Sequence, residues 1–493
     1  MKYLRITIFS ISLLFTLTAH ALEFNVDNLK FTTNTDSTSV TVMKTETKPV
    51  GVLVIPSHVT YNGKNYAVTT IGADAFGGCT ELTSVTIPEG VTSIGMFAFD
   101  YCINLASIVI PSSVTLISFD VFDTCESLTS ITIPEGVKSI EARTFYYCSN
   151  LTSITLPASL TSIGQEAFME CTSLASVKIP SNVTSIGFAA FCACSSLTSI
   201  TIPGGVTSIE TGTFYVCSSL TSITLASGVT SIGESAFERC SSLSSIMLPA
   251  SLTSIGEYAF RDCWKLTAVA IPEGVTSIGL CAFQACNSLV SISIPEGITS
   301  IKQSVFDDCS SLTSVIIPVS VTSIVENAFI GCSSLTSIVF PANLTSIGVH
   351  AFYQCSALQE IYVRNPTPPI CNISGDDQYI VFDGAVKSIC KLYVPIGSKA
   401  AYAAANEWKD FENIEEADMS SVPESEETPF MINTDGDGIT ITGAESGATI
   451  TVYTITGTEL LTLPATGDKQ RIALPLRGIY FVKAGNQVKK IIL

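Results

Sequence analysis

The stretch that decides the fold reads CSSLTSITIPGGVTSIETGTFYVC and runs from Cys194 to Cys217. Nearly the same phrase returns on both sides of it with a period of 23 residues. Phenylalanine recurs at this spacing from Phe76 to Phe352, cysteine follows each phenylalanine by three residues, and leucine follows each cysteine by three. The thirteen copies contain no insertion or deletion. Such a fixed period predicts a solenoid, in which each copy forms one coil of a stack.

The letters inside one copy predict two short strands and a return segment. In LTSITIP, Ile200 and Ile202 alternate with Thr201, as on a strand with one buried face. Pro203 ends this strand, because proline cannot donate to a sheet ladder. VTSI then predicts a second strand, and FYVC predicts a tight return segment, either a turn or a short helix. One coil cannot bury its apolar face alone, so stacked coils should form continuous buried columns of Leu, Ile, Phe and Cys.

The pattern L-x-x-[IV]-x-[IL]-P followed by F-x-x-C resembles the BspA-like leucine-rich repeats of bacterial surface proteins. The resemblance covers residues 71–362 and departs from the pattern only locally, for example where Ala226 replaces the proline. It implies a mostly β leucine-rich-repeat solenoid of about thirteen coils.

The overall composition narrows the classes of partner. The chain has 493 residues, 46% of them hydrophobic and only 14% charged, and its formal net charge is −19. An acidic protein of this kind is repelled by nucleic acid and by anionic lipid, so we expect neither as a partner.

The first 21 residues predict a signal peptide. Basic residues precede an apolar stretch from Ile6 to Leu17, and the small residues Ala19 and Ala21 fit cleavage before Leu22. No later stretch reaches about 18 uninterrupted apolar residues, so we expect no membrane span in the mature chain. The protein is therefore expected to be exported.

The segments beside the repeats predict two caps and a second domain. Residues 22–70 predict an N-terminal cap, since VTYNGKNYAV has an Asn-Gly pair typical of a β-hairpin. Residues 363–415 predict a C-terminal cap with a strand and a short alanine-rich helix, and 416–429 an acidic, proline-broken linker. Residues 430–493 alternate in short runs that predict a small β-sandwich.

Three phrases of this last domain resemble the C-terminal sorting domain of type IX secretion substrates. They are VYTITGTELL, LRGIYFVKAG and VKKIIL, and the resemblance places the sorting motif at Gly457, Gly478, Tyr480 and Lys490. It implies contact with the secretion machinery and passage through the outer membrane of a Gram-negative bacterium, followed by surface attachment or extracellular release. The alternative is a structural or lectin-like sandwich without a sorting role.

Thirteen of the 17 cysteines lie on the repeat column. Side chains of a stacked column point the same way, which suits packing better than the torsion of a disulfide. One thiol per coil does not match a zinc site either, so we expect buried, unreactive thiols and no metal. Outside the column, Cys371 and Cys390 are close in the sequence and are the best candidates for a disulfide.

The sequence offers no catalytic constellation. After the signal peptide the chain has only His58 and His350, and neither lies beside a nucleophile motif. Acidic pairs such as Asp307-Asp308 occupy positions that change from coil to coil, which favours a solvated rim over a glycosidase pair. We expect neither an enzyme nor a bound cofactor.

Comparison of the copies separates a constant core from a variable surface. The positions just before and just after the repeated Ala-Phe change in every copy and carry many aromatic side chains, which are favourable contact anchors on a rigid surface. The alternative is that these rings lie flat over the edge of the core. The candidate partner-binding residues are Phe97, Tyr101, Phe119, Tyr146, Tyr147, Phe188, Tyr215 and Tyr258.

The outward Thr and Ser residues of LTSITI and VTSI form a second candidate face. Regular hydroxyls on a flat surface suit ice or a repeating glycan, but they equally suit a filler that hydrogen-bonds along the stack. We expect the filler.

These observations favour an exported cell-surface protein that mediates adhesion by binding a host or bacterial surface protein or glycan. The resemblance supports this function, because BspA-like proteins include adhesins to host matrix proteins and to other bacteria. The alternatives are a repeat scaffold within a carbohydrate-processing enzyme or accessory protein, and a passive component of a surface layer.

Overall fold

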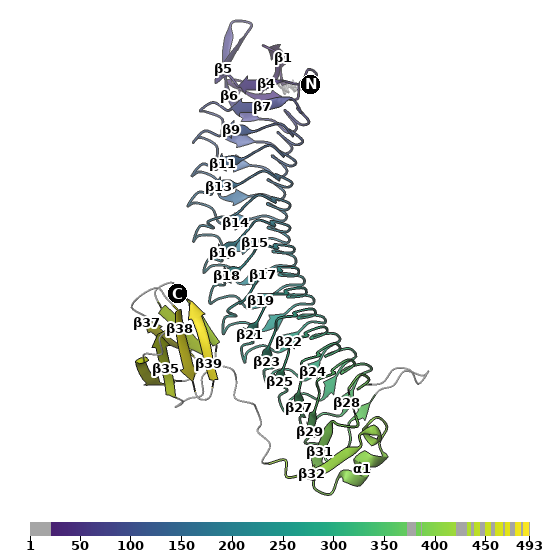
Figure 1. The fold of residues 1–493 in the computed structure, drawn as a ribbon. Coiled ribbons are helices and arrows are strands. Elements are labelled where there is room, and N and C mark those ends of the chain that lie inside the picture. The colour runs from purple at the N-terminus through teal and green to yellow at the C-terminus, as the bar shows by residue number, and fades with distance from the viewer. Residues whose placement is uncertain are drawn as a thin grey trace, which may run out of the picture.

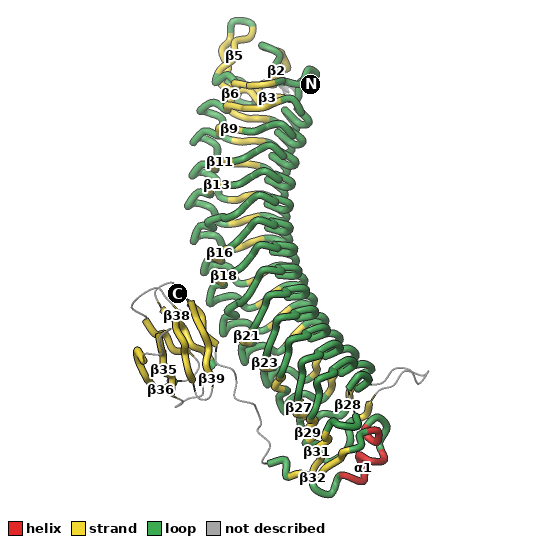
Figure 2. The backbone as a smooth tube through the Cα atoms, viewed as in Figure 1, coloured by secondary structure: helices red, strands yellow, loops and turns green. Residues whose placement is uncertain are grey.

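The computed structural model describes residues 21–371, 381–385, 387–420, 431–434, 438–443, 449–454, 459–466, 469–473, 479–484 and 487–492. Figure 1 shows the repeats as a long, curved stack of coils, and Figure 2 shows that strands occupy only a small part of each coil. In these described ranges the only helices are α1 (Lys399–Ala404) and the 3-10 helix η1 (Trp408–Asp410), so the mostly β solenoid is confirmed.

The first strand predicted in each copy belongs to a column of parallel strands. Ser199, Ile200 and Thr201 pair with the equivalent residues of the next copy, so the register advances by one full copy per coil. Isoleucine points into the core while Ser and Thr face solvent, as the alternation predicts. The strands of this column within the repeats are β7 (Leu82–Thr86), β9 (Ser107–Val109), β11 (Ser130–Thr132), β13 (Ser153–Thr155), β16 (Ser199–Thr201), β18 (Ser222–Thr224), β21 (Ala268–Ala270), β23 (Ser291–Ser293), β25 (Ser314–Ile316), β27 (Ser337–Phe340) and β29 (Glu360–Val363).

The VTSI phrase forms the second column of parallel strands. Here too Ser139 and Ile140 pair with the equivalent Ser162 and Ile163 of the next coil. The strands are β8 (Ser93–Ile94), β10 (Leu116–Ile117), β12 (Ser139–Ile140), β14 (Ser162–Ile163), β15 (Ser185–Ile186), β17 (Ser208–Ile209), β19 (Ser231–Ile232), β20 (Ser254–Ile255), β22 (Ser277–Ile278), β24 (Ser300–Ile301), β26 (Ser323–Ile324) and β28 (Ser346–Ile347).

The return segment of each coil is a run of turns, not a helix. Ala189 and Ala193 lie two residues before and after Phe191, and their φ angles are 50° and 58°. The backbone N–H groups of these three residues donate to carbonyl oxygens of the next coil at 2.7–3.0 Å. A left-handed backbone costs a residue with a side chain about 1 kcal/mol, and these hydrogen bonds between coils offset that cost.

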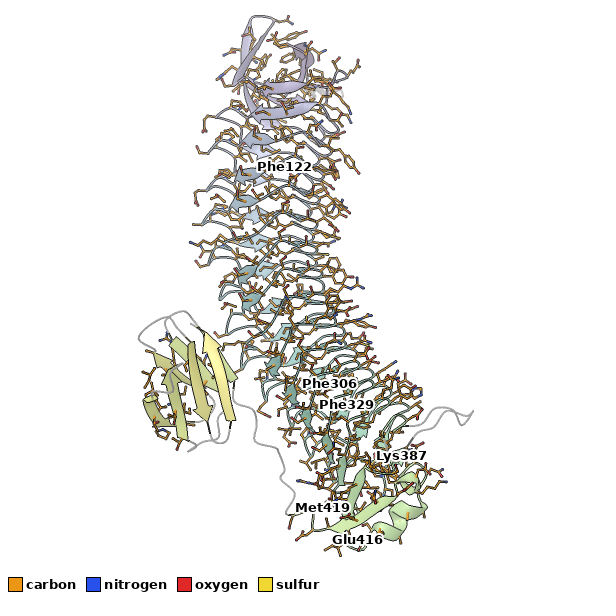
Figure 3. All side chains as sticks on the ribbon, in the orientation of Figure 1. Phe122, Phe306, Phe329, Lys387, Glu416 and Met419 are labelled. Atoms are coloured by element: carbon orange, nitrogen blue, oxygen red, sulfur yellow. The ribbon has the colours of Figure 1, made fainter. Side chains whose placement is uncertain are left out.

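Phenylalanine forms the central column of the core. Neighbouring rings from Phe76 to Phe352 lie 5.2–5.8 Å apart between centroids and within 18° of parallel. Phe122, Phe306 and Phe329 mark this column in Figure 3. Phe382 continues it beyond the thirteenth copy, 5.5 Å from Phe352. The continuous apolar columns that the period predicts are therefore present.

The N-terminal segment extends both strand columns. A hairpin joins β5 (His58–Tyr61) to β6 (Lys64–Ile71), and Asn62 and Gly63 both have positive φ, which confirms the predicted turn. Strand β6 pairs with β8, and β1 (Glu23–Val26), β2 (Leu29–Thr33) and β3 (Ser39–Met43) extend the sheet beyond it. Strand β4 (Gly51–Val54) pairs with β7 and begins the first column.

The C-terminal end of the stack is closed by aromatic side chains. Strands β31 (Lys391–Pro395) and β32 (Asn413–Ala417) continue the first column, and β30 (Ile370–Cys371) continues the second. The predicted strand and alanine-rich helix are confirmed as β31 and α1. Tyr402 and Trp408 are fully buried, and Trp408 lies 5.4 Å from Phe382 between ring centroids.

The last domain has two antiparallel sheets with a core of their own. One sheet has the order β33-β34-β37 and the other β36-β35-β38-β39. Inward side chains of both sheets, among them Ile439 and Val452, form one buried cluster, as in a sandwich. The strands are β33 (Met431–Thr434), β34 (Gly438–Thr442), β35 (Thr449–Thr454), β36 (Glu459–Pro464), β37 (Lys469–Ala473), β38 (Ile479–Ala484) and β39 (Gln487–Ile492).

Candidate binding surfaces

The variable positions form four columns next to the phenylalanine column. They lie three and two residues before, and one and two residues after, each phenylalanine. Phe97 and Tyr101, which flank Phe99 at two residues' distance, have φ angles of 58° and 55°. Because hydrogen bonds hold each return segment to the next coil, side chains in these variable columns repeat at a fixed spacing of about 4.8 Å.

Five candidate residues gather on the N-terminal coils and are called the aromatic patch below. They are Phe97, Tyr101, Phe119, Tyr146 and Tyr147. Phe97 and Phe119 meet edge to face at 5.6 Å between ring centroids, and Tyr146 and Tyr147 lie 5.0 Å apart. Tyr101 is 57% exposed, and Phe97, Phe119 and Tyr147 are exposed by more than a third, whereas Tyr146 is half-buried.

An ion-pair network, which the sequence did not reveal, lies beside this patch. Arg143 donates from Nη2 to Asp123 Oδ2 at 2.6 Å, and its Nε lies 3.0 Å from Asp120 Oδ1. Its guanidinium also covers the ring of Tyr146, 4.2 Å from the centroid. Asp120 and Asp123 are buried, so Arg143 compensates charges that would otherwise lie unpaired against the core.

The pKa values of two acidic groups near the patch, Asp100 and Asp120, are raised. Burial, followed by the neighbouring charges of Asp123, Asp120 and Asp74, raises the pKa of Asp100 to about 6. Burial also raises the pKa of Asp120, although Arg143 opposes that shift. The surface around the aromatic rings therefore carries more negative than positive charge, and part of that charge is poorly solvated.

The other candidate residues lie on later coils and do not join the aromatic patch. Phe188 is exposed by 46%. Tyr215 accepts a hydrogen bond from Arg239 Nη1 at 3.4 Å, and the guanidinium of Arg261 lies 5.5 Å from the ring centroid of Tyr258.

Trp264 is a further exposed aromatic residue that the sequence analysis missed. It is 54% exposed, and its indole N–H donates to Asp262 Oδ1 at 3.3 Å. It lies four residues after Phe260, where other copies carry Ser, Thr, Asn, Glu or Ile. A comparison of the copies at this position would have found it.

The cysteine column is buried and free of disulfides, as expected. From Cys102 to Cys355, each thiol lies 3.1–3.3 Å from the carbonyl oxygen of the phenylalanine 26 residues earlier, to which it donates. Burial raises the pKa of these thiols, for example that of Cys102 to about 12. The column therefore contributes packing and weak hydrogen bonds between coils, not reactive thiolates.

The predicted Cys371–Cys390 disulfide is wrong. Both residues are free thiols. Cys371 lies on β30, which extends the second strand column, whereas Cys390 directly precedes β31 of the first column. Closeness in the sequence does not bring the two side chains together, because the chain crosses between the two sheets of the coil.

The regular Thr hydroxyls hydrogen-bond along the stack. Thr161 Oγ1 donates to the carbonyl oxygen of Lys138 at 2.9 Å, and Thr253 Oγ1 donates to that of Thr230 at the same distance. These donors are used within the protein, which favours the filler interpretation over an ice-binding or glycan-binding face.

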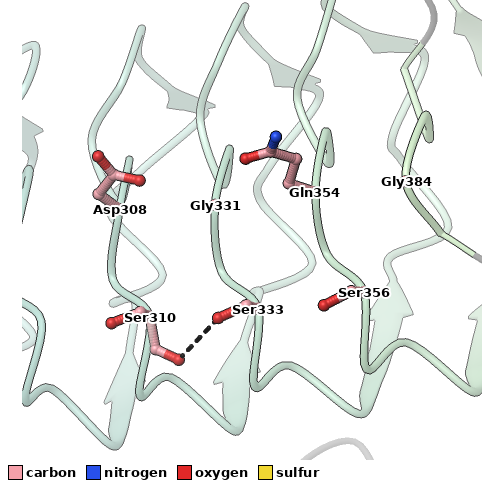
Figure 4. Close-up of a pocket in the computed structure, with 7 residues that line it drawn as sticks. All are labelled: Asp308, Ser310, Gly331, Ser333, Gln354, Ser356 and Gly384. Carbon is pink, nitrogen blue, oxygen red and sulfur yellow. Dashed lines mark hydrogen bonds between the residues drawn. The ribbon is translucent and has the colours of Figure 1, made fainter.

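A shallow groove of about 500 Å³ opens on the C-terminal coils. Figure 4 shows two rows of lining residues, with Asp308, Gly331, Gln354 and Gly384 above and Ser310, Ser333 and Ser356 below. Ser333 Oγ donates to the Ser310 carbonyl oxygen at 3.4 Å. The lining has no apolar side chain, so it suits a ligand that forms hydrogen bonds.

The two histidines lie in different parts of the stack. His58 Nδ1 lies 3.2 Å from Ser57 Oγ in the hairpin, and His350 stacks beside Tyr353 at 5.0 Å between centroids. In the described part of the chain, no group of three or more His, Cys, Asp or Glu side chains is arranged to hold a metal ion. Within the same residues, no helix has the length and apolarity needed to cross a membrane.

The sorting-motif residues are only partly covered by the structure. Gly457 and Gly478 lie outside the described residues. Tyr480 lies on β38, opposite Thr454 and Ile491, and Lys490 lies on β39, opposite Phe481. The sorting role stays a prediction.

Comparison with protein families identifies the repeat. Six copies of the BspA type leucine-rich repeat region match residues 59–171, 138–267 and 253–373. The chain belongs to this family. Comparison with curated proteins finds no significant match.

Solved structures of bacterial leucine-rich repeat proteins resemble the chain. One, from Bacteroides ovatus ATCC 8483, is 28% identical with a TM-score of 0.60, and the match covers 80% of this chain and all of the other. A leucine-rich cell surface protein from Faecalibacterium prausnitzii A2-165 is also 28% identical, with a TM-score of 0.38 and coverage of 74% and 99%. The relatives are repeat proteins, a family of scaffolds and not of enzymes.

Proposed function

We propose that the protein is a non-catalytic surface adhesin whose coil stack displays the aromatic patch to a partner protein. The observation that carries this proposal is the exposure of Phe97, Tyr101, Phe119 and Tyr147 on a backbone held by hydrogen bonds between coils. Exposed rings on a rigid backbone bury much area at little cost in conformational entropy, which makes them strong anchors for binding.

The charge beside the patch favours a partner segment with cationic side chains. Asp100, Asp120 and Asp123 lie beside the rings, and Arg143 is the basic side chain that pairs with the last two. A Lys or Arg from the partner would find both a carboxylate and an aromatic face there. We therefore propose a host or bacterial surface protein with an exposed basic and apolar segment.

We also propose that the protein is exported to the outer-membrane surface, with the C-terminal sandwich as its sorting domain. The signal-like first 21 residues and the resemblance of the last phrases to sorting domains support this. Fractionation of the native cells, with N-terminal sequencing of the protein, tests it. Mature protein that begins at Leu22 in the outer membrane or medium is expected, and full-length protein in the cytoplasm would contradict it.

Capture of partners by the purified mature chain tests the binding function. The wild type is compared with a variant in which Phe97, Tyr101, Phe119 and Tyr147 are all replaced by Ser, on immobilised host matrix proteins and bacterial surface extracts. A variant with Val290→Ser and Val319→Ser is the control, since these valines are equally exposed on later coils. We expect the four-residue variant alone to lose capture while its unfolding transition stays unchanged.

Three outcomes would contradict this proposal. Full capture by the four-residue variant would show that the aromatic patch is not the binding surface. Reproducible hydrolysis of a glycan by the wild type would favour the scaffold of a carbohydrate-processing enzyme, whereas no capture of any partner would favour a passive surface layer.

A further inference from the structure

We propose that the C-terminal coils hold a second site, which binds a neutral glycan along the axis of the stack. The site combines the groove with a track of residues that each follow a column phenylalanine by four positions. These track residues are Trp264, Asn287, Ser310, Ser333 and Ser356. The site is separate from the aromatic patch and does not depend on the function proposed for it.

Two glycines open the groove. Gly331 has a φ of 73°, and a Cβ atom built there would lie 2.4 Å from Asp308 Oδ1. Gly384 has a φ of 90°, and a Cβ atom there would lie 3.0 Å from the backbone of Gln354. Other coils carry side chains such as Tyr147 or Arg239 at these positions. The absence of a Cβ atom at both places leaves the carboxylate and the carboxamide facing an open notch (Figure 4).

The polar groups of the groove are available to a ligand. Among the described residues, neither the carboxylate of Asp308 nor the carboxamide of Gln354 is seen to bond with another protein group, in contrast to the carboxylate of Asp307, which accepts from Gln284 at 2.7 Å. The hydroxyl groups of Ser310 and Ser333 make only long bonds, of 3.5 and 3.4 Å, so a ligand hydroxyl could replace these partners at little cost.

Trp264 supplies the apolar contact that the groove lacks. It stands in the same column as Ser310, two coils earlier, which corresponds to about 10 Å along the stack. Asn287 lies between them and is fixed by its bond from Nδ2 to the Asp308 carbonyl oxygen at 2.9 Å. An exposed indole ring stacks well on the C–H face of a pyranose, and the rows of hydroxyl, carboxylate and amide groups match its hydroxyls.

The same groups disfavour other classes of ligand. The Asp308 carboxylate repels phosphate, sulfate and acidic sugars, because no basic side chain pairs with it among the residues that line the groove. The absence of apolar side chains among the lining residues disfavours lipids and apolar peptides. A neutral chain of sugars laid along the track satisfies both conditions, with one ring on Trp264 and others over the serines.

The tryptophans of the protein make the test direct. The chain has only two, and Trp408 is fully buried whereas Trp264 is exposed, so a change in tryptophan fluorescence on ligand addition reports on Trp264. The full mature chain is titrated with neutral tetrasaccharides of β-linked glucose, α-linked mannose and N-acetylglucosamine. We expect a saturable change with at least one of them, together with protection of Trp264 from quenching by acrylamide.

Variants locate the binding and keep the proposal falsifiable. By calorimetry, Asp308→Asn with Gln354→Ala, or Trp264→Ala alone, should weaken binding about tenfold or more, equivalent to the loss of one good contact. Glu170→Gln is the control, since Glu170 occupies the same column as Asp308 outside the groove.

Three results would overturn the glycan site. They are no saturable response to any tetrasaccharide, binding that the groove variants leave intact, and binding at the groove of a lysine-rich peptide instead of a sugar. The four-residue variant of the aromatic patch should keep its tetrasaccharide binding, and the groove variants should keep their capture of protein. Failure of one site is therefore distinguishable from failure of the other.

Discussion

Phe145 and Tyr146 are neighbours in the sequence but belong to two different regions of the molecule. Phe145 is fully buried and stacks between Phe122 and Phe168 at 5.5 and 5.4 Å, whereas Tyr146 lies half-buried beneath the guanidinium of Arg143. A change in the phenylalanine column disturbs the coils on both sides, whereas an exposed side chain of a variable column can be changed at a smaller cost in stability. The core ring and the neighbouring ring proposed for recognition therefore occupy separate columns of one repeated backbone.

The largest expected effect compares two phenylalanines three residues apart. Phe191→Ala should lower the free energy of unfolding by about 3–5 kcal/mol, because it removes a buried ring that stacks on both neighbours. Phe188→Ala, on the exposed side of the same coil, should cost less than about 0.5 kcal/mol. Chemical denaturation measures both, and equal losses would break the distinction between the columns.

The next effect concerns charge in the variable columns. Arg143→Ala should destabilise the protein by about 2 kcal/mol, because it leaves the buried carboxylates of Asp120 and Asp123 unpaired. Arg239→Ala is the matched control, since Arg239 is half exposed and lies 3.6 Å from Asp262, an arrangement worth about 0–1 kcal/mol. If thermal unfolding shows equal losses of stability for both variants, the Arg143 network contributes no more than an exposed ion pair.

A smaller effect tests the left-handed backbone beside the phenylalanine column. Gly212 has a φ of 62°, and a Cβ atom added there would make only ordinary contacts, at 3.9 Å from Ala189 Cβ and 4.0 Å from Tyr215 Cβ, so Gly212→Ala should cost about 1 kcal/mol through conformation alone. Ala193→Gly, at a φ of 58°, should stabilise by up to a similar amount. The melting temperatures of the two variants should shift in opposite directions. Shifts of the same sign would contradict a left-handed backbone at these two positions.

An effect of similar size depends on pH. The folded pKa of Asp100 is raised from 3.8 to about 6, so the folded state binds the proton more tightly than the unfolded state. The stability that this provides is complete below about pH 4 and is lost as the pH rises through 6. Asp100→Asn should therefore be more stable than the wild type at pH 7, by about 1 kcal/mol after allowance for solvent screening, and close to it at pH 4. The same difference in stability at both pH values would show that the folded state does not raise the pKa of Asp100.

The sequence predicts the core of this molecule better than its surface. The period fixes which residues stack, so the Phe76–Phe352 column and the pairing of equivalent strands follow from it. The left-handed turns do not follow from the period, because bulky residues such as Phe97 and Arg143 occupy these turns. Only contacts between coils hold such residues in a left-handed conformation. Likewise, Arg143 pairs with Asp123, 20 residues away, and only the stacking places the two charges together.

Two further differences have the same physical origin. Cys371 and Cys390 are close in the sequence but lie in separate strand columns, so their separation along the chain misled the disulfide prediction. Trp264 was missed because its importance comes from its column, where it is the single aromatic ring among polar and aliphatic residues. In a solenoid, the residues that contact one another in space are the equivalent residues of neighbouring copies, not those close in the sequence.

The most direct test of the account measures partner capture and the free energy of unfolding together for Phe119→Ser and Phe122→Leu. Phe119 is 39% exposed in the aromatic patch, and Phe122 is fully buried in the core column. We predict that Phe119→Ser weakens capture without loss of stability, and that Phe122→Leu loses stability without weakening capture. If either variant changes both quantities, or if the two exchange their effects, the separation of recognition from stability is contradicted.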